Sequence, residues 1–156
     1  MRRLALILLA APALADPPTL LRPPIEPACI SSPFGPRPAI GRRPPGHHNG
    51  IDLPAPAGAP VRAAAAGRVV FLRRLAGYGM VVELDHGGLR TRYAHLGRVT
   101  PALAQGRRDV AAGMPLGVAG RSGITYGTHV HFEVRIGGRP VDPAPFLPGL
   151  RPCPAR

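Results

Sequence analysis

Lysine and tryptophan are missing from this 156-residue chain, and aromatic residues make up only 4% of it. The hydrophobic fraction is nevertheless 45%, which is enough for a folded core and excludes an intrinsically disordered chain. With so few aromatic rings, the core must be built mainly from valine, leucine, isoleucine and alanine. The basic residues are all arginines, and a coding bias is the simplest explanation for that choice.

The arginines give the chain a net charge of +12, which favours an anionic partner. They are scattered along the sequence, singly or in pairs. The chain also lacks the interleaved aromatic residues on which single-stranded nucleic acid stacks. We therefore expect no nucleic-acid partner, and an anionic cell-wall polymer suits the charge as well.

Residues 1–15 have the three parts of a secretory signal peptide. Arg2 and Arg3 form the charged start, residues 4–12 form a short apolar stretch, and Ala-Leu-Ala at 13–15 is an A-x-A cleavage site. The apolar stretch is too short to span a bilayer, and no later segment has the length or the apolar character of a transmembrane helix. We expect an exported protein. The periplasm is the preferred location, and the extracellular space or the cell wall is the alternative. No integral membrane segment is expected after cleavage.

Proline and glycine, with 22 and 20 copies, divide the rest of the chain into short pieces. They favour short strands joined by tight turns over helices. We expect a Pro-rich linker at 16–27, one domain at 28–150 and a C-terminal tail at 151–156. The stretches 77–96 and 128–143 have the form of β-hairpins, the second with a Gly-Gly turn.

The expected fold is therefore mostly β, a compact single domain of antiparallel β-sheets. The chain shows no internal repeat and no convincing amphipathic helix. Within the first hairpin, the returning strand is expected to end near His95. The turn of that hairpin holds His86, which we expect to be exposed and structural.

Cys29 and Cys153 are the only cysteines and lie near the two ends of the expected domain. In an exported protein such a pair is typical of a disulfide bond. Two unrelated thiols, or a bridge to another chain, remain open as alternatives. Neither cysteine has a second Cys or His beside it, so neither is expected to bind zinc.

Five of the six histidines lie in three short segments: HHNGID at 47–52, YAHL at 93–96 and THVHFEV at 128–134. His129 and His131 are two residues apart on an expected strand, so both imidazoles point to the same face. Taken alone, such a pair is more often structural than metal-binding.

His48 and Asp52 are four residues apart, with a glycine between them, and a turn into a strand could fold one back on the other. An aspartate near a glycine is also a common turn former. His47 is a competing ligand candidate. For His95, a half-buried structural histidine at a strand end is the alternative interpretation.

Together, histidine and aspartate suit a catalytic zinc site, which takes three protein ligands and leaves one position for water. Further histidines would supply the proton transfer that metal-assisted hydrolysis requires. The combination predicts a metallohydrolase.

The three segments, in this order, resemble the M23 family of zinc metallopeptidases, also called lysostaphin-like or LytM-type peptidases. The similarity extends to SSPFGPR at 31–37 and spans roughly residues 30–147. It implies an antiparallel β-sheet with a groove that carries a zinc site. Thr128 replaces the proline of many relatives and Val130 their leucine, and neither change removes a ligand.

The resemblance implies that His48, Asp52 and His131 bind one Zn²⁺ per chain and that His95 and His129 are catalytic. We expect His129 to be the general base and His95 to stabilise the oxyanion. Members of this family cut peptide bonds in the stems or cross-links of peptidoglycan. The chain is accordingly expected to be a secreted, monomeric zinc metalloendopeptidase with a peptidoglycan peptide as its substrate.

A catalytically silent LytM-type regulator, which binds and activates a murein amidase, is the alternative function. Such regulators have lost metal ligands, whereas every ligand position is filled here. Arg37, in the matched SSPFGPR segment, is a candidate for the substrate groove. A surface arginine in a turn is the other interpretation of Arg37.

Overall fold

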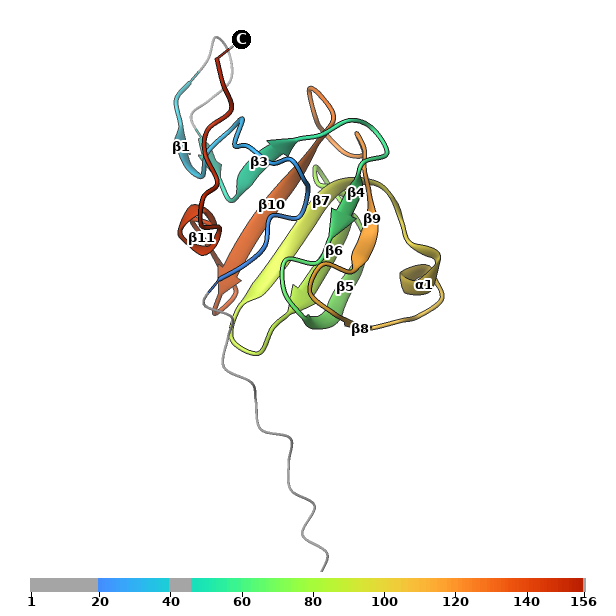
Figure 1. Ribbon diagram of the computed structural model, residues 1–156. Coiled ribbons are helices and arrows are strands. Elements are labelled where there is room, and N and C mark those ends of the chain that lie inside the picture. Colours follow the sequence, from blue (N-terminus) through green and yellow to red (C-terminus); the bar gives the residue numbers. More distant parts are fainter. Residues whose placement is uncertain (1–19, 40–45, 156) are drawn as a thin grey trace, which may run out of the picture.

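The computed structural model describes residues 20–39 and 46–155, which form a mostly β structure, as the sequence predicts (Figure 1). The strands are β1 (Gly35–Arg37), β2 (Gly46–His48), β3 (Ile51–Pro54), β4 (Pro60–Arg62), β5 (Gly67–Leu75), β6 (Gly79–Asp85), β7 (Arg90–Val99), β8 (Asp109–Val110), β9 (Pro115–Ala119), β10 (His129–Ile136) and β11 (Arg139–Val141). The helical elements are α1 (Pro101–Ala104) and η1 (Ala144–Phe146). Within these ranges, no helix has the length and apolar character needed to cross a membrane. The expected signal peptide at 1–15 lies outside the described residues.

One large antiparallel sheet carries most of the described chain. Its strands run in the order β11-β10-β7-β6-β5-β8, with β3 paired to β10, and β9 paired to both β7 and β4. β1 and β2 form a separate two-stranded sheet. Figure 1 shows β10 and β7 side by side in the middle of the molecule, with β3 crossing near one end of β10.

Both predicted hairpins are present, since β6 pairs with β7 and β10 pairs with β11. Gly137 and Gly138 have φ values of 57° and 79°, the left-handed conformation that a tight two-residue turn requires. The strand β7 differs from the prediction, because it continues past His95 to Val99. It can do so because it exchanges its partner β10 for β9 beyond Ala94.

The core is mainly aliphatic, as the shortage of aromatic residues predicts. Tyr93 and Phe132 are the fully buried aromatic side chains in the described part of the chain, and their ring centroids lie 5.3 Å apart. Burial raises the pKa of Tyr93 to about 12, although the N–H of Ala64 donates a hydrogen bond to its hydroxyl. Burying each large side chain stabilises the fold by about 1.5–3 kcal/mol.

In its described part, the Pro-rich segment expected as a linker packs on the domain. Leu21 and Ile25 are buried in the core. The N–H of Leu21 donates to the carbonyl of Phe146, and the N–H of Arg22 donates to that of Ala64. Figure 1 shows this segment, in blue, crossing one face of the sheet. The two apolar side chains among the prolines anchor the segment, because an extended linker would leave them in water.

Cys29 and Cys153 form a disulfide within the chain, which confirms the predicted pairing. The backbone beside the bond is also paired. The N–H of Ile30 donates to the carbonyl of Arg151, and the N–H of Cys153 donates to that of Ile30. The disulfide thus joins the N-terminal segment to the C-terminal tail.

His86 is buried, contrary to the expectation of an exposed turn residue. Its Nδ1–H donates to the carbonyl of Ala66 at 2.7 Å, and its Nε2 is hydrogen-bonded to the hydroxyl of Thr91 at 2.8 Å. Burial lowers the pKa of His86, and the hydrogen bond to Ala66 only partly opposes this effect. His86 therefore stays neutral and ties the hairpin turn to the segment before β5.

We predict that replacing both cysteines with serine destabilises the protein by up to about 5 kcal/mol, because the bond closes a loop with a sequence separation of 124 residues. Urea unfolding of the oxidised wild type, the reduced wild type and the double variant measures this effect. Reduced wild type and the double variant should unfold at the same urea concentration. A double variant as stable as the oxidised protein would contradict the prediction.

We also predict that His86 makes stability fall on acidification. Its folded-state pKa is lowered, so only the unfolded chain takes up the proton as the pH drops below the ordinary value of 6.5. Stability is full above that value and is lost as the pH falls towards the folded-state pKa.

The variant His86→Gln tests this pH dependence. It should be less stable by about 1–3 kcal/mol at pH 7.5, since it disturbs two buried hydrogen bonds. Its melting temperature should then fall less than that of the wild type between pH 7.5 and pH 5. If the melting temperatures of the wild type and the variant fall by the same amount across this pH range, His86 is not the group responsible.

Candidate metal centre

A groove of about 610 Å³ opens beside β2, β3 and β10. His48, Asp52, His95, His129 and His131 all line it. The structure therefore brings together the five residues that the sequence singled out, from segments as far as 83 positions apart.

The pairing of β3 with β10 sets the position of the site. Asp52 lies directly opposite His131 in the register of these strands. Because side chains alternate along a strand, His129 and His131 face the groove, while Val130 and Phe132 are fully buried behind them. The predicted common face of the two histidines is confirmed.

The turn between β2 and β3 folds His48 back towards Asp52. A side chain at Gly50 would overlap the backbone carbonyl oxygen of Phe132, so only glycine allows the turn to lie this close to β10. The result is a distance of 3.1 Å between His48 Nε2 and Asp52 Oδ1.

His48, Asp52 and His131 direct one atom each to a common point. His131 Nδ1 lies 2.9 Å from Asp52 Oδ1 and 3.1 Å from His48 Nε2. Tetrahedral zinc bonds of about 2.0–2.2 Å separate ligand atoms by about 3.3–3.6 Å. A small outward shift of these side chains therefore accommodates the ion.

In His48 and His131, one ring nitrogen faces Asp52 and is called the inner nitrogen, and the other, outer nitrogen points away from it. The hydrogen bonds of the outer nitrogens determine which atoms are left to bind a cation. His48 Nδ1–H donates to the carbonyl of Pro33 at 2.7 Å, and His131 Nε2–H donates to Glu133 Oε1 at 3.1 Å. In the neutral rings the inner nitrogens are unprotonated, and their lone pairs face the oxygen of Asp52. Three converging lone pairs repel one another unless a cation lies among them, so the donor set fits zinc.

The ionisation of the cluster agrees with a cation site. Burial opposes the ionised form of Asp52, but hydrogen bonds with His131 and His48 outweigh burial and hold the pKa of Asp52 well below its ordinary value. Burial likewise disfavours the charged form of His131, yet Asp52 and Glu133 outweigh it and raise the pKa of His131. Asp52 is therefore ionised, and the inner nitrogen of His131 beside it favours a cation, either a proton or a metal ion.

A buried ion-pair network lies behind His131. Glu133 is fully buried and bonds His131, Arg135 and Arg92, and Arg92 also pairs with Glu83 on the neighbouring strand. Burial would raise the pKa of Glu133, but the hydrogen bond from His131 and the two arginines lower it to about 2. Glu133 is therefore ionised, and it fixes the orientation and tautomer of His131.

His95 reaches the groove from a strained position in β7. Its φ of 59° is the only left-handed value among the described non-glycine residues. The pairing of β6 with β7 shifts register between Met80 and Val82, which marks a bulge at His95. Such strain stores about 1–3 kcal/mol and is typical of functional positions.

The hydrogen bonds of His95 and His129 place a proton on Nδ1 of each ring. His95 Nδ1–H donates to the carbonyl of Ser122 at 2.8 Å, and His129 Nδ1–H donates to that of Gly127 at 3.0 Å. The two ring centroids are 4.8 Å apart. Burial lowers the pKa of His95, so this imidazole is neutral near pH 7 and able to accept a proton.

His47, the competing ligand candidate, is exposed at the groove and does not belong to the cluster of ligand atoms in the described residues. Its ring packs edge-on against Phe34, with centroids 4.9 Å apart. Arg37 lines the groove, as expected of a groove residue, and donates to the second oxygen of Asp52.

The sequence interpretation missed Glu133 and Ser122. Glu133 could have been found, because it continues the alternation of His129 and His131 on the same strand face. Ser122 carries no comparable signal, since it lies in a loop and acts through its backbone carbonyl on His95.

Comparison with known proteins places these features in a family. Residues 46–143 match the model of peptidase family M23. Over 119 residues the chain is 44% identical to the DD-carboxypeptidase/endopeptidase Mpg of Neisseria meningitidis serogroup B, covering 73% of this chain and 26% of that protein. It is 37% identical to the peptidoglycan DD-endopeptidase ShyB of Vibrio cholerae, covering 72% of this chain and 26% of the relative.

The fold is also similar to a solved structure, that of a zinc-containing peptidase from Vibrio cholerae. The TM-score is 0.70 at 30% identity, covering 83% of this chain and 39% of the other. The chain spans about a quarter of the length of the curated relatives it matches.

We predict that Glu133→Gln lowers the affinity for zinc by about 10- to 100-fold, because the amide holds His131 less firmly than the carboxylate does. Competition with a chromophoric zinc chelator measures the affinity. Glu83→Gln is the matched control, since Glu83 pairs with the same Arg92 without bonding His131. Equal losses of affinity in both variants would mean that the network only stabilises the sheet.

Proposed function

This chain belongs to peptidase family M23, and we propose that it is a zinc-dependent DD-peptidase that hydrolyses peptide bonds in the stems or cross-links of peptidoglycan. The convergence of His48, Asp52 and His131 on one point, beside two further histidines, carries the proposal. The names of the relatives support the choice of substrate and bond.

In this proposal His48, Asp52 and His131 hold one zinc ion. When bound, the ion would supply a water whose pKa falls from about 15.7 to about 7, and it would polarise the scissile carbonyl. The chain's own contribution is a set of ligands whose tautomers are fixed in advance by Pro33 and Glu133.

The proposed general base is His129. Its Nε2 lies 3.6 Å from Asp52 Oδ1, and its Nδ1–H is bound by the carbonyl of Gly127. In the tautomer with its proton on Nδ1, Nε2 can accept a proton beside the cluster, which suits transfer from the attacking water to the leaving amine.

His95 has the proposed role of stabilising the oxyanion. Burial keeps the ring neutral at rest, and a proton taken up from solvent as the oxyanion develops would give the Nε2–H that donates to it. The hydrogen bond from Nδ1–H to Ser122 holds the ring in place and leaves Nε2 for the substrate.

An exported location agrees with the intrachain disulfide, because such bonds persist in oxidising compartments. We propose the periplasm as that compartment, where peptidoglycan is accessible. The complete ligand set distinguishes this proposal from the catalytically silent regulator, which would not need it.

Digestion of purified peptidoglycan, followed by mass spectrometry of the products, tests the proposed function. Zinc-loaded protein should split cross-linked dimers with the gain of one water per bond, and a chelator should stop the reaction. Intact dimers after incubation with protein that carries one zinc would count against the proposal. Enhancement of an amidase by zinc-free protein would instead support the regulator.

We predict that His129→Ala and His95→Ala each lower kcat by about 10²- to 10⁴-fold while the protein keeps one zinc per chain, because neither is a ligand. Elemental analysis and the dimer-cleavage assay measure the two quantities. His131→Ala should lose both metal and activity, whereas His47→Ala should keep the metal. Loss of zinc from His129→Ala or His95→Ala would require a different ligand set.

A further inference from the structure

Arg37 is the only arginine among the groove-lining residues of the described chain. It lies at the end of β1 opposite Gly46 of β2, the strand that ends at His48. Its side chain is 42% exposed, so the guanidinium is in contact with both the groove and solvent.

The contacts of Arg37 fix the guanidinium and leave part of it available. Nη2 donates to Ser32 Oγ at 2.9 Å and to Asp52 Oδ2 at 3.3 Å. Both hydrogen bonds that the structure shows for this side chain start from Nη2. Nη1 and Nε carry further N–H donors that point to different sides of the planar guanidinium, so Nη1–H can donate a charge-assisted hydrogen bond to a carboxylate while Nη2 keeps its two partners.

The charges around the groove favour an anionic substrate group. Apart from histidines, the charged side chains that line it are Asp52 and Arg37. One carboxylate cannot neutralise both a divalent cation and an arginine. The groove beside Arg37 would therefore carry an excess of positive charge, and a substrate anion would be attracted to it.

The leaving side of a DD-peptide bond offers such an anion. A carboxypeptidase releases a terminal residue, whose carboxylate is attached to the carbon that carries the leaving nitrogen. A cross-link through the side-chain amine of a diamino dicarboxylic acid has the same arrangement when the carboxylate on the amine-bearing carbon is free. One carboxylate site could therefore serve both reactions.

We propose that Arg37 forms a carboxylate subsite on the leaving-group side of the scissile bond. The inference rests on the proposed function and extends it to specificity. Nη2 stays on Ser32 and Asp52, while Nη1–H donates to the substrate carboxylate. The enzyme then prefers bonds whose leaving residue carries a free carboxylate, whether the residue is terminal or part of a cross-link.

A pair of peptides tests this subsite, each ending in two D-alanines, one with a free carboxylate and one with a C-terminal amide. The wild type should favour the acid by roughly 10- to 100-fold in kcat/KM, the range of a charge-assisted hydrogen bond. Arg37→Gln should bring the ratio of acid to amide close to one by slowing only the acid. Arg37→Lys keeps the charge without the planar guanidinium that bonds Ser32 and Asp52, and it should give an intermediate ratio.

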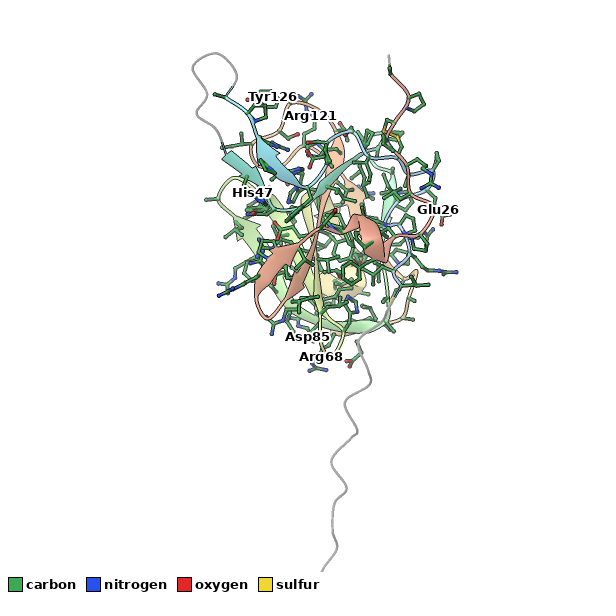
Figure 2. The ribbon with its side chains drawn as sticks, turned by 90° about the vertical axis from the view of Figure 1, so that its left-hand side faces the viewer. Glu26, His47, Arg68, Asp85, Arg121 and Tyr126 are labelled. Carbon is green, nitrogen blue, oxygen red and sulfur yellow. A yellow bond between two sulfur atoms is a disulfide. The ribbon has the colours of Figure 1, made fainter. Side chains whose placement is uncertain are left out.

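The ratio of kcat/KM for the acid to that for the amide separates an effect on substrate binding from an effect on the metal site. Both peptides are cleaved with the same metal and histidines, so damage to the metal site would slow both equally. Zinc content is measured for each variant, since Arg37 also contacts Asp52. Arg68→Gln is the matched control, as it removes the same charge from an exposed side chain outside the groove. Figure 2 shows Arg68 at the opposite end of the molecule from Tyr126, a groove residue. This control should keep the wild-type ratio.

Two results would overturn the inference while leaving the proposed function in place. One is a wild type that cleaves acid and amide equally well. The other is an Arg37→Gln variant that slows on both substrates by the same factor, which would make Arg37 a support for Asp52 alone. A zinc-loaded wild type that cleaves neither peptide nor cross-linked dimers would remove the proposed function itself, and the subsite with it.

Discussion

The register between β3 and β10 is the constraint on which the site depends. It sets Asp52 opposite His131, and Gly50 allows the preceding turn to come close enough for His48 to join them. Since a slip of one residue would turn every side chain of a strand to the other face, this pairing decides whether the cluster exists. The fully buried Val130 and Phe132 keep the register, because a slip would expose them.

The surroundings hold each histidine before any substrate arrives. Each of the four histidines of the site donates a hydrogen bond from its outer ring nitrogen to a fixed acceptor. The acceptors are the backbone carbonyls of Pro33, Ser122 and Gly127 and the carboxylate of Glu133. Fixed tautomers leave the inner nitrogens as acceptors. Such preorganisation reduces the rearrangement needed to bind a metal or transfer a proton.

Local patterns predicted the features that depend on neighbours in sequence. The alternation around His131, the Gly-Gly turn and the pairing of the two cysteines were all accessible in this way, and the family resemblance supplied the candidate ligands. Long-range packing decided the rest. His86 is buried and bonds the carbonyl of Ala66, twenty residues away, and the first described residues pack on the domain through Leu21. The bulge at His95 could not be predicted from the sequence either, because it arises where β7 exchanges one partner strand for another.

X-ray absorption at the zinc edge of the loaded protein tests directly whether His48, Asp52 and His131 bind zinc. We predict one zinc per chain, bound by nitrogen and oxygen ligands at about 2.0–2.2 Å. Two of these ligands should be imidazoles, and none should be sulfur. A third imidazole, a sulfur ligand or the absence of bound zinc would contradict it.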